Sequence, residues 1–347
     1  MLESSSLMST ISNHIQSSGS HPSVESRLSS VRQISEYQDW LRCPACLPAT
    51  SAMKRTGGTL ACSVCGSSYE SASGLDLLMT NQDANLFGLH DAGFAGVPQS
   101  DERVLSRQTR AASLLRNAKN TITPVNETAQ RAVGAILQQA EILRRPLNVL
   151  VVGGGTARED LSSLLESELV RSVIFDVYPS DQIDFLADGH RIPMETAVFD
   201  AVWIQAVLEH VAYPWEVAAE IERVTKLGGL IYAETPFMQS VHEGAYDFFR
   251  FGYAGAQLLF AQSNAIDHGV VAGSGVALQW AFRDVAVSLF GERSFPAKLA
   301  YIAGLPISRV GRKRIQRNLD RASSIGVLLE RSKRRVSVAD VVASYGP

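Results

Sequence analysis

The sequence predicts an α/β protein built on a doubly wound sheet and preceded by a small cysteine-rich ribbon. The sheet is predicted by apolar, β-branched segments that alternate with helical patterns, the first of which ends in three glycines within NVLVVGGGTAREDL. The ribbon is predicted by four cysteines that form two CxxC pairs separated by fifteen residues. With 347 residues, the chain is long enough for more than one domain.

The composition is that of a globular protein, with 46% hydrophobic residues and a formal net charge of −3, which gives no overall attraction to nucleic acid or anionic lipid. We expect no membrane span, because no apolar run reaches the roughly 20 residues required. The most apolar segment, residues 270–290, is interrupted by Gln279, Arg283 and Asp284 and is expected to form a buried helix. Residues 1–35 are rich in serine and are expected to be disordered. They lack the pattern of a secretory signal, and the protein is expected to be cytoplasmic.

Residues 36–80 are expected to form the ribbon around a metal ion. The two knuckles would present four thiolates to one ion in a tetrahedral arrangement, from Cys43, Cys46, Cys62 and Cys65. The sequence favours Zn²⁺, although iron in a rubredoxin-like site has the same four ligands. Four thiolates fill the coordination sphere, so the metal is expected to be structural, and no cysteine is left for a disulfide.

The predicted sheet begins with a strand at 147–152, followed by the three glycines at 153–155. A dinucleotide-binding turn needs a small residue where this sequence has Arg158. S-adenosylmethionine has no pyrophosphate and requires only that the backbone pass close to its amino-acid end. Asp176 ends the next predicted strand, where a carboxylate accepts hydrogen bonds from ribose hydroxyls.

The polar residues after the third predicted strand complete this candidate ligand site. Asp188 is expected to accept a hydrogen bond from an adenine amino group, and the amides of Gly189 and His190 to face the ring. Two further strands are predicted at 199–205 and 230–233, because both segments are apolar and flank a helical pattern.

The segment from 147 to about 260 resembles the class I S-adenosylmethionine-dependent methyltransferases of the ubiquinone-methylase-like, type 11 group. This resemblance implies a Rossmann-like fold with a doubly wound, seven-stranded sheet. Three blocks carry the resemblance, FDAV, LEHV and EIERVTKLGG, and they follow Asp188 in the family's order. The sequence departs from the family at Val151, where an acidic residue is common, and at Ala157, where a third glycine is common. The resemblance implies an S-adenosylmethionine site made by Gly153, Gly155, Asp176, Asp188, Gly189 and His190, with Gln205 near the methyl donor.

The loop after the fifth predicted strand, ETPFMQSVHEGAYDFFRFGYAGAQLLF, resembles the acceptor loop of methyltransferases encoded with polysaccharide and glycolipid biosynthesis enzymes. His242 is the candidate general base, because imidazole titrates near neutral pH. Tyr246, Asp247 and Arg250 are candidates to orient this base or to hold a polar acceptor. The alternative is that Asp247 and Arg250 form a structural ion pair. Gly252 stands where that pattern has threonine.

The ribbon sequence, LRCPAC…LACSVCGSSYESASGLDLLM, resembles the small zinc-ribbon activator of tRNA and protein methyltransferases. Between the ribbon and the first predicted strand of the sheet, the sequence predicts a helix that begins after Asn126. The C-terminal part contains RVGRKRIQRNLDR and ERSKRR, which suit a solvated helix face, a phosphate-bearing substrate, a membrane surface or RNA. The predicted limits are 81–145 for a helical cap, 146–290 for the S-adenosylmethionine-binding domain and 291–347 for a basic helical extension.

Three functions are compatible with the sequence. The first is O-methylation of a small molecule, glycan or lipid-linked acceptor by an S-adenosylmethionine-dependent methyltransferase. The second is methylation of tRNA or protein by an enzyme that carries its activator ribbon in the same chain, although the neutral ribbon does not favour nucleic acid as a partner. The third is a non-catalytic nucleotide-binding module, which the departures at Val151, Ala157 and Gly252 suggest. The sequence leaves the oligomeric state open.

Overall fold

The computed structural model describes the chain in nine segments, all of which belong to the compact unit Ile34–Pro347. The expected disorder of residues 1–35 lies outside the described residues, as do most of the expected helical cap and the departure at Ala157. The described residues are 37–47, 51–72, 75–80, 125–155, 159–180, 182–242, 244–291, 294–312 and 316–345.

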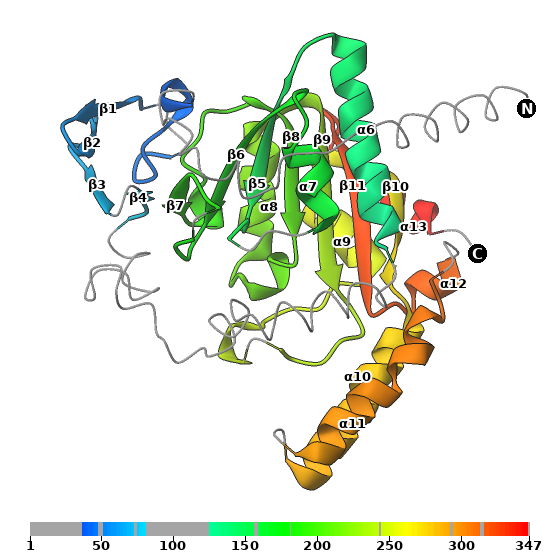
Figure 1. Cartoon of the computed structure of the whole chain (residues 1–347). Coiled ribbons are helices and arrows are strands. Elements are labelled where there is room, and N and C mark those ends of the chain that lie inside the picture. The colour runs from blue at the N-terminus through cyan, green and yellow to red at the C-terminus, as the bar shows by residue number, and fades with distance from the viewer. Residues whose placement is uncertain are drawn as a thin grey trace, which may run out of the picture. The chain divides into compact units, whose positions relative to one another are not determined.

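The centre of the fold is a doubly wound sheet of seven strands in the order β7-β6-β5-β8-β9-β11-β10 (Figure 1). The five strands from β7 to β9 pair in parallel, and β11 runs antiparallel to both of its neighbours. The strands are β5 (Leu147–Val152), β6 (Val170–Asp176), β7 (Phe185–Ala187), β8 (Phe199–Gln205), β9 (Thr225–Pro236), β10 (Ser263–Ala272) and β11 (Ser324–Arg331). This is the α/β architecture that the sequence predicts.

The central strand β5 is apolar because both faces of the sheet are covered. Leu150 and Val152 belong to one core cluster, which includes side chains of α8 (Pro214–Val224) and α9 (Tyr253–Leu259). The alternate residues Leu147, Val149 and Val151 belong to the other cluster, with side chains of α6 (Glu127–Leu143) and α7 (Glu159–Leu165). A strand buried on both faces needs no polar alternation, which explains the continuous apolar run.

The predicted limit of the central domain at residue 290 is wrong, because the seventh strand of the sheet lies in the predicted C-terminal extension. Strand β11 inserts between β9 and β10, with Val327 paired to Ala233 on one side and to His268 on the other. Its alternating side chains are buried in the two core clusters. The basic residues on both sides of SIGVLLE obscure this strand in the sequence.

The ribbon is continuous with the sheet. Its strands are β1 (Met53–Thr56), β2 (Thr59–Cys62), β3 (Ser68–Ala72) and β4 (Leu75–Leu78), and consecutive strands pair antiparallel. Strand β4 pairs in parallel with β7, with Leu77 opposite Leu186, so the ribbon extends the seven strands to an eleven-stranded sheet. The sequence predicts the ribbon and the sheet but not that they share an edge.

The start of the ribbon also contacts the segment between β7 and β8. Leu41 forms a β-bridge with Met194, and the amide of Arg42 donates to the carbonyl of Pro193 at 3.0 Å. Trp40 packs edge-on against Phe199, with ring centroids 5.9 Å apart. Backbone pairing and aromatic packing thus join the ribbon to the sheet over two stretches of chain.

Helices α10 (Ser274–Phe290) and α11 (Phe295–Ala303) connect β10 to β11 and correct a second expectation. The apolar segment at 270–290 does form a helix, but much of its surface is exposed, including Phe282 and Leu289. None of the helices in the described segments has the combination of length and apolar character that crossing a bilayer requires.

The remaining described helices are short. They are η2 (Gln38–Trp40), η3 (Gly189–Arg191), η4 (Leu208–His210), η5 (Gly244–Tyr246), η6 (Leu305–Arg309), α12 (Gln316–Leu319) and α13 (Val338–Ser344). Among them, η3 and η4 follow β7 and β8 and position residues of the candidate site.

A buried carboxylate fixes the amino end of the central strands. Asp200 of β8 accepts hydrogen bonds from the side chains of Arg145 and Lys226 and, at 2.9 Å, from the amide of Asn148. Burial alone would raise the pKa of Asp200, but these hydrogen bonds outweigh it and lower the pKa to about 2. Asp200 therefore ties β5, β8 and β9 together in its ionised form.

We expect Asp200→Asn to lower the free energy of unfolding near neutral pH by about 2 kcal/mol, since a pKa lowered on folding means that the folded state stabilises the carboxylate. This contribution is present above the ordinary carboxyl pKa and is lost as the pH falls through about 2. The difference from the wild type should therefore shrink below about pH 4. Urea denaturation at several pH values measures it, with Asp39→Asn on the exposed surface as the control. A difference independent of pH would contradict the assignment.

Candidate functional site

The carboxyl end of β5 turns sharply at the glycines that the sequence singles out. Gly153 has a φ of 72°, and a Cβ atom there would lie 2.2 Å from Cγ2 of Val207. The amides of Gly153 and Gly154 both donate to the carbonyl of Phe175 on β6, at 3.0 and 3.1 Å. The glycines therefore let the backbone turn tightly between two neighbouring strands.

Asp176 lies at this turn, because β5 and β6 pair in parallel and end at the same edge. Its Oδ2 accepts a hydrogen bond from the amide of Gly155 at 2.8 Å, and its Oδ1 accepts one from the amide of Tyr178 at 3.1 Å. Burial raises the pKa of Asp176, and the backbone hydrogen bonds oppose this effect. A Cβ atom on Gly155 would lie 2.7 Å from Oδ2, so glycine is needed for this contact.

Asp188 follows β7 at the same edge and is largely buried. Its Oδ1 accepts from the amide of His190 at 3.0 Å and lies 2.6 Å from Nδ1 of the same residue. The His190 ring in turn accepts at Nε2 from the amide of Tyr213, at 3.2 Å. Gly189 is buried at the start of η3. The amide of His190 is expected from the sequence to face an adenine ring, but in this structure it donates its hydrogen bond to Asp188.

Gln205, at the end of β8, belongs to a buried polar network at this edge. Its Nε2 donates to Oε2 of Glu234 at 3.0 Å and to Oδ2 of Asp160 at 3.4 Å. The same Oε2 of Glu234 accepts from Asn126 Nδ2 and from the Tyr232 hydroxyl, both at 2.9 Å. Burial and the neighbouring Glu234 raise the pKa of Tyr232 well above its ordinary value, so Tyr232 acts as a donor.

Sequence reasoning missed three members of this network, Asn126, Asp160 and Glu234. Glu234 directly follows the apolar core of the fifth predicted strand, and this position was the signal that identified Asp176 and Asp188. The sequence predicts a helix that begins after Asn126, and Asn126 caps this helix, because its Oδ1 accepts a hydrogen bond from the amide of Ala129 at 3.0 Å. Its Nδ2 also binds Glu234, 108 positions away, and no sequence spacing indicates this contact.

The loop after β9 is held by one partly buried ion pair. Asp247 accepts hydrogen bonds from the Arg250 guanidinium through both carboxylate oxygens and, at 2.8 Å, from the amide of His242. Burial alone would raise the pKa of Asp247, but the contacts with Arg250 and His242 lower it to about 2. Arg250 also donates to the carbonyls of Gln239 and Ser240, at 2.9 and 3.0 Å. Asp247 and Arg250 thus form an ion pair that also holds the backbone at Gln239, Ser240 and His242.

His242 lies beside this pair. Its Nδ1 is 3.2 Å from Oδ2 of Asp247 and 3.3 Å from the carbonyl oxygen of Ser240. Both neighbours are acceptors, so Nδ1 carries the proton and Nε2 is the basic nitrogen. Tyr246 contributes its backbone to this region, because its carbonyl lies 2.9 Å from Nδ1 of His210, and its side chain is exposed.

A second histidine accompanies the candidate base. His210 ends η4, and its ring lies edge-on to the ring of His242 with centroids 5.1 Å apart. The buried Glu209 completes the cluster, and one ligand-type atom from each of Glu209, His210 and His242 lies within 4.8 Å of the others. Two loops far apart in the sequence therefore bring two imidazoles and one carboxylate together.

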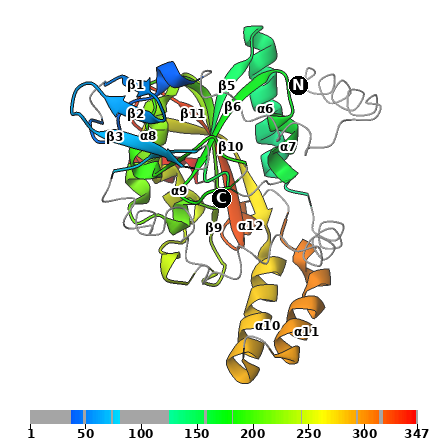
Figure 2. The same cartoon turned by 60° about the vertical axis from the view of Figure 1, so that its left-hand side comes forward.

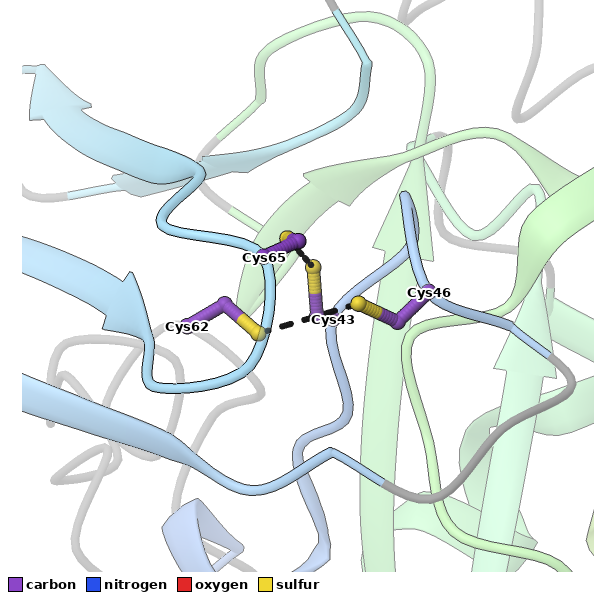
Figure 3. A group of neighbouring side chains, drawn as sticks. All are labelled: Cys43, Cys46, Cys62 and Cys65. Carbon is purple, nitrogen blue, oxygen red and sulfur yellow. Dashed lines mark hydrogen bonds between the residues drawn. The ribbon is translucent and has the colours of Figure 1, made fainter.

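The four cysteines of the ribbon converge on one point (Figure 3). The Sγ atoms of Cys43 and Cys65 are 3.6 Å apart, and those of Cys46 and Cys62 are 3.8 Å apart. Four sulfurs at about 2.3 Å from a central ion would be about 3.8 Å apart in a tetrahedron, so the donor set and its spacing fit a tetrahedral metal. Hydrogen bonding with Ser67 lowers the pKa of Cys65 to about 6.

The candidate site residues of the central domain share one edge of the sheet. The glycine turn, Asp176, Asp188, Gln205 and Glu234 all lie at or near the carboxyl ends of strands β5 to β9. In open α/β sheets, ligands bind at this edge, where the crossover connections diverge. The cysteine cluster lies instead in the knuckles of the ribbon, away from these strand ends.

Comparison with known proteins gives one match in sequence. Residues 167–233, from just after α7 to within β9, match the family model described as a methyltransferase domain. The search of curated protein sequences found no significant match.

Several solved structures show a weak likeness in fold. A putative sarcosine dimethylglycine methyltransferase from Galdieria sulphuraria is 16% identical, with 59% of this chain and 85% of that chain covered and a TM-score of 0.39. A complex between the Haloferax volcanii Trm112 methyltransferase activator and the putative methyltransferase gives 16% identity, 60% and 100% coverage and a TM-score of 0.38. Coclaurine N-methyltransferase is 15% identical, with 60% of this chain and 72% of that chain covered and a TM-score of 0.38. These likenesses are too weak to indicate a substrate.

The family match covers β6, β7, β8 and most of β9 in the central sheet. This part of the chain is similar in sequence to methyltransferase domains, and it lies within the doubly wound sheet.

Proposed function

We propose that the protein transfers a methyl group from S-adenosylmethionine to an oxygen atom of a small molecule, glycan or lipid-linked acceptor. The observation that carries this proposal is the placement of His242 beside Asp247, in the loop that follows β9 at the ligand-binding edge of the sheet. A hydroxyl acceptor loses a proton on methylation, and an oriented imidazole is suited to accept it.

The glycine turn and Asp176 are the proposed cofactor site. Gly155 and Asp176 approach each other closely enough that a methyl group on Gly155 would displace the carboxylate. The carboxylate would accept from the ribose hydroxyls, and Asp188 from the adenine amino group. Gln205 is held by Glu234 and by the indole of Trp203, at 3.2 Å, so it presents a fixed amide near the proposed methyl donor.

In the proposed reaction, S-adenosylmethionine supplies a methyl group on a sulfonium sulfur, and the C–S bond breaks as the C–O bond to the acceptor forms. The proton of the acceptor hydroxyl passes to Nε2 of His242. Asp247 stabilises the resulting imidazolium at Nδ1, while Arg250 holds Asp247 ionised and in place. The chain otherwise contributes alignment, which can supply several kcal/mol of rate acceleration.

The ribbon supports this function as a structural element. We propose that Cys43, Cys46, Cys62 and Cys65 bind Zn²⁺, which would hold the two knuckles together through bonds that a segment of this size cannot replace with a core. Strand β4 would then extend the sheet next to β7, the strand that precedes Asp188. Residues 36–80 carry three basic and four acidic residues, so the ribbon adds no positive surface for tRNA.

We expect Asp176→Ala to weaken S-adenosylmethionine binding about 100-fold, because two hydrogen bonds to a carboxylate are lost. Gly155→Ala should weaken binding as well, because its Cβ atom would push Asp176 aside. Isothermal titration calorimetry with S-adenosylmethionine measures both effects. Gly134→Ala is the matched control, since a Cβ atom there has open space and alanine favours the helix. Wild-type affinity in Asp176→Ala would contradict the cofactor assignment, and a wild type that does not bind would indicate a non-catalytic module.

The acceptor class can be tested with S-adenosylmethionine tritiated in its methyl group. We expect label from the wild type to enter the glycan or lipid fraction of a cell extract as an ether or ester. Label in tRNA or protein would instead support the second function given by the sequence. His242→Gln should lower the rate of labelling about 100-fold, because the base is removed, while calorimetry shows unchanged cofactor affinity. A fully active His242→Gln would contradict the role of this residue.

Metal analysis of the purified protein should find about one zinc ion per chain, bound by the four thiolates. Cys65→Ser should lose the zinc and unfold at a lower temperature, because the two knuckles are no longer joined. Chelator treatment of the wild type should have the same effect, and Zn²⁺ but not Mg²⁺ should reverse it. Iron in place of zinc, or a stable metal-free wild type, would contradict this assignment.

A further inference from the structure

Helices α10 and α11 form an antiparallel hairpin that is inserted between the last two strands of the sheet (Figure 2). Their contact is small and specific. Gln279 is buried between the helices and donates from Nε2 to the carbonyl of Tyr301 at 2.9 Å. Gly304 packs against the Gln279 side chain, and Gly275 against the carbonyl of Ile307. The inner side of α10 therefore packs against α11 and against η6, which follows it.

The outer faces of the hairpin are apolar. On α10, the exposed large apolar side chains recur at intervals of four, three and four residues, at Leu278, Phe282, Val285 and Leu289. On α11, the same four-and-three spacing gives Phe295, Leu299 and Ile302. This spacing places each set along one side of its helix. Toward the turn the exposure is highest, with Leu289 at 70%, Phe290 at 61% and Phe295 at 75%.

Few charges interrupt this surface along the two helices, and the sequence of the turn between them contains one charge of each sign, at Glu292 and Arg293. Among the described residues of the hairpin, the ionisable carboxyl, amino and guanidinium groups are those of Arg283, Asp284 and Lys298. Arg283 lies over the ring of Trp280 at 5.5 Å and 3.8 Å from Asp284, so these groups lie on the side of α10 that faces the loop after β9. Contiguous apolar surface of this kind marks an interaction site in a soluble protein.

The middle of α10 borders the proposed acceptor site. Asp284 accepts a hydrogen bond from the hydroxyl of Ser240, two residues before the candidate base. The ring of Trp280 lies 6.4 Å from the ring of His242. The apolar surface therefore begins beside the loop that would hold the acceptor.

A basic segment follows the hairpin directly. Residues 309–321 carry six basic residues and one acidic residue, in a chain with a net charge of −3. Their start is fixed at the base of α10, because the amide of Gly275 donates to the carbonyl of Val310 at 3.0 Å. Apolar helices next to basic residues are the pattern of segments that bind anionic membrane surfaces. A symmetric contact with a second copy would instead bring two basic segments together.

We propose that the α10–α11 hairpin binds the surface of an anionic lipid bilayer and that the enzyme methylates a lipid-anchored acceptor there. The acceptor part rests on the proposed function. The apolar side chains would enter the boundary between headgroups and acyl chains, and the net positive charge of the segment 309–321 would attract anionic headgroups. The acceptor headgroup would then reach His242 along Trp280 without leaving the bilayer.

The test uses the full chain and vesicles of phosphatidylcholine, with or without about 30% phosphatidylglycerol. We expect co-sedimentation with the anionic vesicles, weaker at high salt and at least tenfold weaker with phosphatidylcholine alone. The double variant Phe290→Ser, Phe295→Ser should bind the anionic vesicles at least tenfold less. Val338→Ser, Val342→Ser is the matched control, because these side chains are 64% and 67% exposed on α13, outside the hairpin, and it should bind as the wild type does.

Two results would overturn the proposal. One is a wild type that binds neither kind of vesicle, and the other is equal binding by the wild type and the hairpin variant. A wild-type dimer that the hairpin variant converts to monomers, without vesicle binding, would assign the surface to a second copy. Calorimetry with S-adenosylmethionine separates this test from the proposed function, since the hairpin variant should keep wild-type cofactor affinity. Vesicle binding by a protein that binds no S-adenosylmethionine would leave the membrane surface standing and remove the methyl transfer.

Discussion

The parallel pairing of β5 with β6 and β8 is the constraint on which the rest of the structure depends. Because β5 is buried on both faces, its sequence is free of polar alternation. Because it pairs in parallel with β6 and β8, the carboxyl ends of the three strands lie at the same edge of the sheet. This brings the glycine turn next to Asp176 on one side and near Gln205 on the other. At the opposite end of the strands, Asp200 of β8 ties β5, β8 and β9 together through its charged hydrogen bonds.

The edge of the sheet is preorganised by polar groups that hold one another. Glu234 accepts from Asn126, Gln205 and Tyr232, which belong to different elements of the fold. Asp247 holds the loop after β9 through Arg250 and the amide of His242. Buried networks of this kind fix side-chain positions before a ligand arrives, and positioning is most of what methyl transfer requires of a protein.

Two additions extend the central domain in different ways. The ribbon is attached through backbone hydrogen bonds of β4 and through the contacts of Trp40 and Leu41, so it lengthens the sheet. The α10–α11 hairpin leaves the sheet between its last two strands and has a mostly apolar outer surface. The ribbon therefore extends the sheet, whereas the hairpin adds an exposed apolar surface.

The sequence by itself determined the local features of this protein. The apolar run at 147–152, the glycines that follow it and the spacing of the cysteines predicted a strand, a tight turn and a four-thiolate cluster, because each depends on neighbouring residues. It also placed Asp176, Asp188 and Gln205 at strand ends, since the end of an apolar run is visible without a structure. The hydrogen bonds of these residues were not predictable, and the Asp188 carboxylate binds His190 in this structure.

Tertiary structure alone decided the contacts between distant segments. It placed β11 inside the sheet, joined β4 to β7 and paired Asn126 with Glu234 across 108 positions. It also showed that the apolar helix at 274–290 is exposed and that His210 lies against His242. The physical reason is that periodicity reports the character of a face, whereas the partner of that face is selected by packing energies summed over the whole chain.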